Sequence, residues 1–286
     1  DRSNVRSRAA DALVELGNSS ETVVNGLLAL LKDDRSNVRS RAADALGKLG
    51  NSSDTVVNGL LALLKDDRSN VRSRAADALG KLGNSSDTVV NGLLALLKHN
   101  HSNVRSSAAD ALVELGKGSE TVVNGLLALL KDHRSDVRSS AADVLGKLGN
   151  SSDTVVKPLL ELLKDNNSNV RREAANVLGK LGNSSDTVVK PLLELLKHNH
   201  SNVRREAANV LGKLGNSSDT VVNALLAMLG NSESNVHHRA VIALVKLGKT
   251  SNHILPTVIE WIEQHQDSDY VGRGIDVLWD LVVGEE

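Results

Sequence analysis

The stretch from Ser36 to Gly50, SNVRSRAADALGKLG, recurs with small changes along almost the whole chain at a spacing of 33 residues. Successive copies are so alike that residues 34–66 and 67–99 differ only at their last position. A fixed period of this length is typical of stacked repeats, each of which buries its apolar face only against its neighbours. The sequence therefore predicts a repeat array before any single motif is considered.

Each repeat predicts two helices. At about 100° per residue, five apolar positions of the quoted stretch fall on one face, which indicates an amphipathic helix. These positions are Val38, Ala42, Ala45, Leu46 and Leu49. Ser36 is expected to cap the start of this helix and Gly50 its end. After a turn at residues 51–54, a leucine-rich helix is expected from about residue 55 to residue 65. The fold class is therefore all-α, with about eight regular two-helix units.

The end of the chain departs from this pattern. Residues 1–230 are near-identical repeats, whereas residues 231–286 form a divergent last repeat that holds both tryptophans and the one tyrosine. Terminal units must close the end of a stacked core and become atypical for that reason. We expect one domain over residues 1–286 that ends in a cap helix. A functional patch around Trp261, Tyr270 and Trp279 is the alternative.

Composition argues against several classes of protein. No apolar run approaches the roughly 20 residues that span a bilayer, so no membrane protein is expected. A formal net charge of -1 does not attract nucleic acid, and the absence of cysteine removes disulfides and thiolate metal sites. No signal peptide opens the chain, and the cytoplasm is the expected compartment. Because the first residues enter within a repeat, we expect either a piece of a larger multidomain protein or a consensus-like design.

The first helix of the chain has no preceding partner in this sequence. Its apolar residues Val5, Ala9, Leu13 and Leu16 are therefore expected to be partly exposed, or covered by missing sequence or by another molecule. We expect a monomer whose uncapped N-terminal end is available to associate with another molecule.

Two stretches resemble a known family. VRSRAADALGKLG (Val38 to Gly50) and VVKPLLELLKD (Val155 to Asp165) are similar to HEAT-like repeats, in particular the short subtype of phycobilisome lyases and artificial alpha-helical repeat scaffolds. The resemblance covers all eight regular units. It implies a right-handed α-α superhelix of the HEAT/armadillo type, in which the first helix of each repeat lines the concave surface.

The same resemblance implies a ladder of turn aspartates and helix arginines from successive repeats. The matching residues here are Asp33, Asp66, Asp132 and Asp165 with Arg39, Arg72, Arg138 and Arg171. His99, His198 and Asn231 occupy the aspartate position in three other turns and depart from the family pattern.

Any ligand on the concave surface would meet the polar side of the first helices. This side consists of the positions equivalent to Asn37, Ser40, Arg41, Asp44 and Lys48, which we call the inner stripe. The candidate partner-binding residues on it are Arg8, Asp11, Asn37, Ser40, Arg41, Asp44, Lys48, Asn70, Arg74, Asp77, Lys81, Asp110, Asp143, Arg172, Glu173, Asn176, Arg205, Glu206 and Asn209. Their charges are mixed, and none of them is aromatic.

Two interpretations of the inner stripe stay open. It is either a solvated face of short-range ion pairs or a groove that binds a partner protein or peptide. Without aromatic anchors, such a groove would favour weak, charge-guided or multivalent recognition over a deep pocket. We expect a non-catalytic interaction scaffold. The alternatives are a bilin lyase or lyase subunit, which the family resemblance suggests, and a HEAT-like nucleic-acid-binding protein, which would need a basic concave track.

The histidines suggest a metal site but lack its ligands. His99 with His101, and His198 with His200, form HxH pairs in turns, and no third ligand stands at a convincing distance. No nucleophile elbow and no phosphate loop is present. We therefore expect no catalytic residue, no metal and no cofactor.

Overall fold

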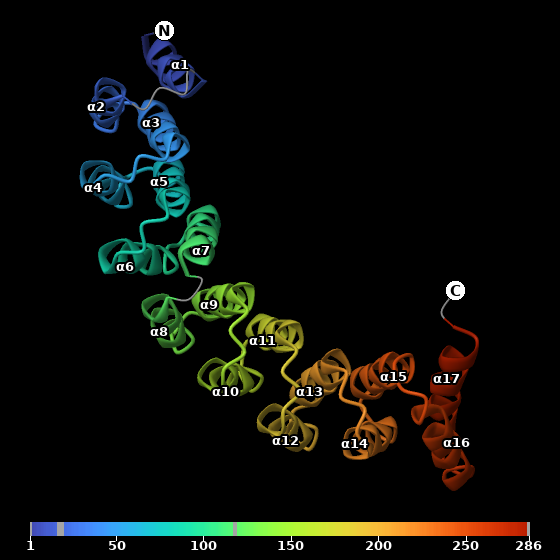
Figure 1. Cartoon of the computed structure of the whole chain (residues 1–286). Helices are drawn as coiled ribbons and strands as arrows, with labels where there is room; N and C mark the ends of the chain where they lie inside the picture. Colours follow the sequence, from blue (N-terminus) through green and yellow to red (C-terminus); the bar gives the residue numbers. More distant parts are fainter. Residues whose placement is uncertain (1, 16–19, 117–118, 285–286) are drawn as a thin grey trace. The chain divides into compact units, whose positions relative to one another are not determined.

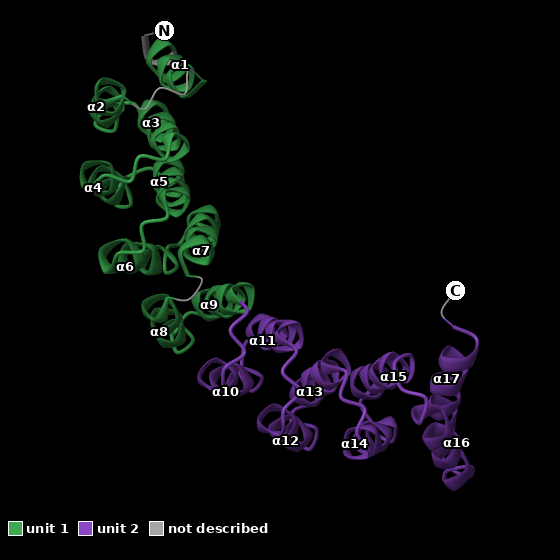
Figure 2. Ribbon diagram, viewed as in Figure 1, with its two compact units in different colours: residues 1–148 green, residues 149–286 purple. Residues whose placement is uncertain are grey.

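The computed structural model of the chain describes residues 2–15, 20–116 and 119–284. Over these residues the chain forms seventeen α-helices and no β-strand (Figure 1). The helices belong to two compact units, Asp1–Leu148 and Gly149–Glu286 (Figure 2). The predicted all-α class is confirmed.

The helices of the first unit are α1 (Arg2–Glu15), α2 (Glu21–Leu30), α3 (Ser36–Leu49), α4 (Asp54–Leu63), α5 (Ser69–Leu82), α6 (Asp87–Leu96), α7 (Ser102–Gly116), α8 (Glu120–Leu129) and α9 (Ser135–Leu148). Those of the second unit are α10 (Asp153–Leu162), α11 (Ser168–Leu181), α12 (Asp186–Leu195), α13 (Ser201–Leu214), α14 (Asp219–Leu229), α15 (Ser234–Gly248), α16 (Ile254–Gln264) and α17 (Val271–Val282). None of the helices described here is long and apolar enough to cross a membrane.

The ends of a first helix show which local predictions were right. Gly50 has a φ of 70°, the left-handed conformation that ends a helix and that glycine adopts without strain, so its predicted role is confirmed. The prediction for Ser36 was wrong: Arg35 is the N-cap residue, and Ser36 already belongs to α3. The reason is the preceding turn, where the Asp33 carboxylate accepts the Arg35 amide at 3.0 Å and fixes where the helix begins. In the turn after α3, Asn51 likewise accepts the Ser53 amide at 3.0 Å.

The core lies between the two helices of each repeat and between successive repeats. In α3, Val38, Ala42 and Leu46 have no solvent exposure, and in α4 the same is true of Val56 and Leu60. These are the positions that the helical periodicity predicts.

Within each unit, the first helices of the repeats stack into one row and the leucine-rich helices into another (Figure 1). Glycine allows the first helices to approach closely: a Cβ on Gly47 of α3 would lie 2.8 Å from the Cα of Ala78 in α5. Gly80 with Ala111, and Gly212 with Ala243, repeat this contact. Neighbours in the leucine-rich row touch much less. Each unit therefore bends toward the row of first helices, which we call the inner row; the other is the outer row.

The two ends of the chain differ from the middle. Val5 is 67% exposed and Ala9 is also exposed, while Leu13 is half-buried, as predicted for a first helix without a preceding partner. The fourth residue of that prediction, Leu16, lies outside the described residues. At the other end, α17 packs on α16 and α15, with Gly274 against Trp261.

Candidate interaction surface

The inner stripe is largely open to solvent. Nine of its candidate residues are exposed: Arg8, Asn37, Arg41, Lys48, Asn70, Arg74, Lys81, Asp110 and Arg172. Nine others are half-buried: Asp11, Ser40, Asp44, Asp77, Asp143, Glu173, Asn176, Arg205 and Asn209. In each unit these side chains come from consecutive helices of the inner row, so the structure brings them together along one face of that unit.

Glu206 does not belong to this open surface. It is only 4% exposed, and its carboxylate accepts a hydrogen bond of 2.6 Å from Nη2 of Arg205. Glutamate is shorter than the arginine at the equivalent position of α3, and the neighbouring guanidinium lies over it. The prediction that Glu206 is available to a partner was therefore wrong.

Ion pairs join neighbouring helices across the inner stripe. Lys48 pairs with Asp44 within α3 at 2.9 Å, and Lys81 of α5 reaches the same carboxylate at 3.4 Å. Burial by itself raises the pKa of Asp44, but the hydrogen bonds and charges of Lys48 and Lys81 outweigh it and hold this pKa below its usual value. In the same way, Lys147 of α9 pairs with Asp143 at 3.1 Å and with Asp110 of α7 at 3.4 Å.

In the second unit, one lysine of the inner row has no aspartate at the position equivalent to Asp44. Lys213 of α13 donates to the side-chain oxygen of Asn176 in α11 at 2.7 Å, where the equivalent lysine in α5 meets the carboxylate of Asp44. Burial and the like charges of Lys246 and Arg239 lower the pKa of Lys213. The inner stripe is therefore a polar surface whose local charge changes from repeat to repeat.

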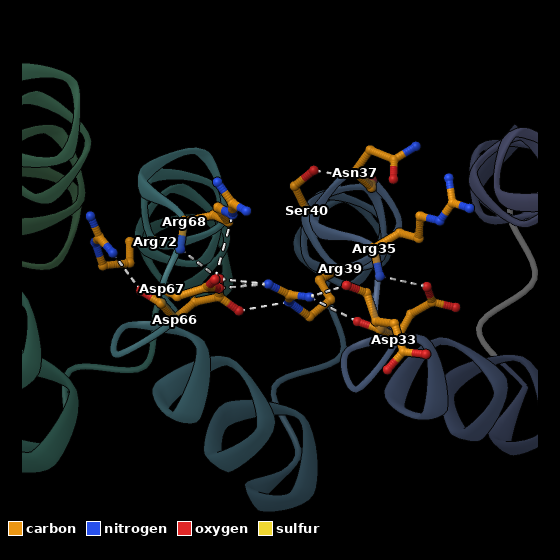
Figure 3. Close-up of polar contacts among 10 residues, drawn as sticks. Asp33, Arg35, Asn37, Arg39, Ser40, Asp66, Asp67, Arg68 and Arg72 are labelled. Carbon is orange, nitrogen blue, oxygen red and sulfur yellow. Dashed lines mark hydrogen bonds and ion pairs between the residues drawn. The ribbon is translucent and has the colours of Figure 1, made fainter.

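The ladder of turn aspartates and helix arginines is present at the edge of the inner row (Figure 3). Nε and Nη2 of Arg39 donate to the two carboxylate oxygens of Asp66 at 2.7 and 2.8 Å. Nη1 of the same arginine donates to the backbone carbonyl of Asp33 at 2.9 Å. Arg6 pairs with Asp33 at 2.8 Å in the preceding repeat. Arg39 thus holds its own turn through a carbonyl and the next turn through a carboxylate. The prediction fails at Asp132, which pairs with Lys98 at 3.3 Å, while Arg105 of the preceding repeat pairs with Asp136 at 3.4 Å.

The substitutions in the turns interrupt the ladder where they remove that carboxylate. Arg72 reaches toward the turn of His99, and Arg171 stands in the same relation to the turn of His198. Both arginines are more than nine-tenths buried, and unlike Arg39 neither of them pairs with a carboxylate among the described residues. In the third turn without the aspartate, Asn231 accepts a long hydrogen bond of 3.4 Å from Arg204.

The histidine pairs lie in these same turns. The rings of His99 and His101 are 5.4 Å apart, and Nδ1 of His99 accepts the backbone amide of His101. Burial and the charges of Arg72 and Arg105 lower the pKa of His99. Within the described part of the chain, no three His, Cys, Asp or Glu side chains come close enough together to hold a metal ion.

The sequence patterns did not predict a cavity on the surface of the second unit. A cavity of about 410 Å³ lies between the turn after α10 and the start of α13, and Arg171 is part of its lining. The signal that could have indicated it is the exchange of aspartate for histidine at position 198, which leaves an arginine 27 residues earlier without its carboxylate.

Comparison with known proteins gives a family and a fold. The family model for HEAT repeats matches residues 1–80, 57–146, 123–189, 156–244 and 189–273. No curated protein sequence matches the chain.

Among solved structures, Kap121p is similar over 98% of this chain and 36% of its own, with a TM-score of 0.72 and 14% identity. Importin beta is similar over 92% of this chain and 41% of its own, with a TM-score of 0.62 and 14% identity. The complex of CpcE and CpcF of phycocyanin lyase from Nostoc sp. PCC7120 aligns over 93% of this chain and 97% of its own, at 24% identity and a TM-score of 0.43. The chain thus spans less than half of the length of Kap121p and of importin beta.

The family model covers most of the chain, and the described helices stack in pairs with an arginine-aspartate ladder at their turns. The chain belongs to the HEAT repeat family.

Proposed function

We propose that this chain is a non-catalytic scaffold that binds a partner protein or peptide along the inner stripe. The observation that carries the proposal is the row of exposed charged side chains that consecutive inner helices present at the same position, such as Arg41 in α3 and Arg74 in α5. Their side chains are 57% and 56% exposed, and each has only a loose ion pair, at 3.4 Å to Asp11 and at 3.5 Å to Asp77. Both guanidinium groups are available to acceptors on a partner.

A solved structure of similar fold supports a protein or peptide as the partner. Kap121p bound to Nup53p has a TM-score of 0.71 to this chain at 15% identity. The inner stripe differs from a typical tight interface because none of its candidate residues is aromatic. We infer recognition through several charge-assisted contacts spread over successive repeats, each of them weak.

The two alternative functions find less support in this surface. A bilin site would need aromatic side chains around the chromophore, and the residues of the inner stripe are all polar. Nucleic-acid binding would need a continuous basic track, whereas Asp44 follows Arg41 by one helical turn and Asp77 follows Arg74 in the same way.

Affinity capture with charge-reversed variants tests the proposal. The whole chain is used as bait in an extract of its native cell, and a captured polypeptide is identified by mass spectrometry and titrated as a purified protein. Arg41→Glu combined with Arg74→Glu should weaken its binding at least about tenfold, which is about 1.4 kcal/mol.

The control is Lys157→Glu combined with Lys190→Glu on the outer row. These lysines are 67% and 73% exposed and pair with Asp153 and Asp186 one turn earlier, so the change in charge is the same. The control should bind as the unmodified chain does. Equal binding by all three proteins would remove the inner stripe from the proposal.

A further inference from the structure

Arg171 is a buried cation whose ladder partner has been replaced. Only 7% of the residue is exposed. Its Nη1 donates to the backbone carbonyls of Asp165 at 2.5 Å and Asn166 at 3.0 Å, which anchors the guanidinium at the turn after α10. No protein acceptor among the described residues reaches its buried Nε. Where Arg39 meets the carboxylate of Asp66, 27 residues later, Arg171 has His198 at the equivalent position in the sequence.

The guanidinium borders a cavity of about 410 Å³ in the second unit. The cavity is lined by Lys164, Asp165, Asn166, Arg171, His200, Asn202 and Val203. His200 is the N-cap residue of α13, and Asn202 and Val203 belong to its first turn. In this 14-residue helix the amide of Val203 already donates to the carbonyl of His200, and the amide of His200 to Nδ1 of His198. The helix start therefore offers the cavity the amide of Asn202 and the positive end of the helix dipole. The cavity therefore combines a buried arginine, a lysine and a helix N-terminus.

One carboxylate lies in the lining and must be weighed against these cations. Oδ1 of Asp165 accepts the backbone amide of Asn167 at 2.8 Å, so this group already takes part in the turn. Lys164 is 44% exposed and bonds both carboxylate oxygens of Glu161, at 3.2 and 3.3 Å. A surface pair of this kind contributes little stability, so the lysine can turn toward a ligand. Once Lys164 turns from Glu161 toward the cavity, two cations and the helix N-terminus face the one carboxylate of the lining and outweigh it.

We propose that this cavity binds a phosphate group, either as inorganic phosphate or as a phosphate monoester. Arginine forks match the geometry of phosphate oxygens, and helix N-termini bind such anions through their amides. The volume falls in the range of about 300–1,000 Å³ that is usual for small-molecule sites, so the phosphate can be part of a larger molecule.

The first unit contains a matched comparison. Arg72 is 8% exposed and has His99 at the position where Arg171 has His198. The positions equivalent to the other lining residues of the cavity carry the same residue types, with one exception: Lys65, Asp66, His101, Asn103 and Val104. The equivalent positions differ at one residue of the lining, where Asp67 stands in place of Asn166. The Asp67 carboxylate accepts a hydrogen bond from Arg39 at 2.9 Å. A second carboxylate repels phosphate, so we place the site at Arg171 and not at Arg72.

Reciprocal exchange of this residue tests the proposal. Calorimetric titration of the whole chain with inorganic phosphate, at low and constant ionic strength, should show one phosphate bound per chain. Asn166→Asp should weaken binding at least about tenfold. This variant should keep the fold, because aspartate occupies the equivalent position at residues 34 and 67. Asp67→Asn should raise the stoichiometry to two phosphates per chain.

Two results would overturn the site. One is the absence of phosphate binding by the unmodified chain, and the other is phosphate binding by Asn166→Asp with unchanged affinity. Arg171→Met should also abolish binding, but it removes two turn hydrogen bonds; its melting temperature is therefore compared with that of Arg72→Met, which loses the equivalent turn contact without a proposed site.

Comparing two ligands shows whether the site binds a free phosphate ion or a phosphorylated protein. Titration is repeated with a phosphoserine peptide and with the same peptide lacking the phosphate. Tighter binding of the phosphopeptide than of inorganic phosphate assigns the site to a phosphorylated partner, and the reverse order assigns it to a small anion. Either order supports the site when Asn166→Asp weakens both ligands. Equal binding of the two peptides, together with no response to inorganic phosphate, contradicts it.

Discussion

Removal of the Asp66 carboxylate should cost far more stability than removal of the Asp132 carboxylate, although both are turn aspartates at the same place in the repeat. The side chain of Asp66 is 7% exposed and that of its partner Arg39 is 13% exposed. Removing one member of a buried ion pair typically costs about 3–5 kcal/mol, because the other charge stays buried without compensation. Arg39 keeps one hydrogen bond to Asp67, which places Asp66→Ala near the low end of that range, at about 3 kcal/mol.

Asp132 provides the matched control. Its carboxylate is 9% exposed, but its ion-pair partner Lys98 is 54% exposed and 3.3 Å away. A pair with such an exposed lysine contributes about 0–1 kcal/mol. Both aspartates also accept an amide in their own turn, Asp66 from Arg68 at 2.9 Å and Asp132 from Arg134 at 3.0 Å, worth about 1 kcal/mol each. Asp132→Ala should therefore cost about 1–2 kcal/mol.

Urea unfolding followed by circular dichroism measures both variants against the unmodified chain. Both variants lose the turn hydrogen bond, so the ion pairs alone set the difference: about 3 kcal/mol for Asp66 against about 0–1 kcal/mol for Asp132. We therefore expect a lower midpoint for Asp66→Ala, by an amount that corresponds to about 2–3 kcal/mol. Equal midpoints would refute the reasoning, because they would mean that the close, buried contact between Arg39 and Asp66 adds nothing beyond the turn hydrogen bond.

Two further predictions concern glycine and acid. Gly26→Ala should raise the melting temperature, because nothing lies within 4 Å of the added Cβ and alanine is more favourable than glycine in a helix by about 1 kcal/mol. Gly80→Ala should lower the melting temperature, because the added Cβ would lie 2.8 Å from the Cα of Ala111 and overpacking costs about 1–3 kcal/mol. An equal response of the two variants in thermal melts would contradict the close approach of α5 and α7. Stability should also fall in acid. Hydrogen bonds and ion pairs hold the pKa values of Asp66 and Asp132 below their unfolded value of about 3.9, so their contribution is complete above that pH and is lost as the pH falls through the lower folded values. Urea midpoints measured from pH 6 to pH 3 should therefore decrease, and more for the unmodified chain than for Asp66→Ala.

The fold could be predicted from the sequence because its decisive contacts are local or repeat with one period. The apolar positions Val38, Ala42 and Leu46 identify the buried face of a helix, and Gly50 marks its end, since few other residues adopt its φ without strain. The contact between Arg39 and Asp66 joins residues 27 apart, which only the family resemblance could suggest. Near-identical copies then carry each of these features along the chain.

The remaining features depend on side-chain packing that the periodic pattern does not describe. Helical periodicity placed Glu206 on the polar side of its helix, but it does not show that Arg205 covers it. Similarly, the exchange of aspartate for histidine at position 198 is visible in the sequence, while its consequence falls on Arg171 in the preceding repeat. The first effect depends on how neighbouring side chains of α13 pack, and the second on the relative placement of two repeats. The apolar periodicity of one repeat contains neither.

Site-specific photo-crosslinking tests the scaffold proposal most directly. A photoreactive residue replaces Arg41 or Arg74 on the inner row, or in control proteins the exposed Ala62 of α4 or Ala95 of α6 on the outer row. Each protein is irradiated with the captured partner, and the cross-linked fraction is measured. The account predicts efficient cross-linking from positions 41 and 74 and little from positions 62 and 95. The reverse pattern, or equal cross-linking from both rows, would contradict binding along the inner stripe.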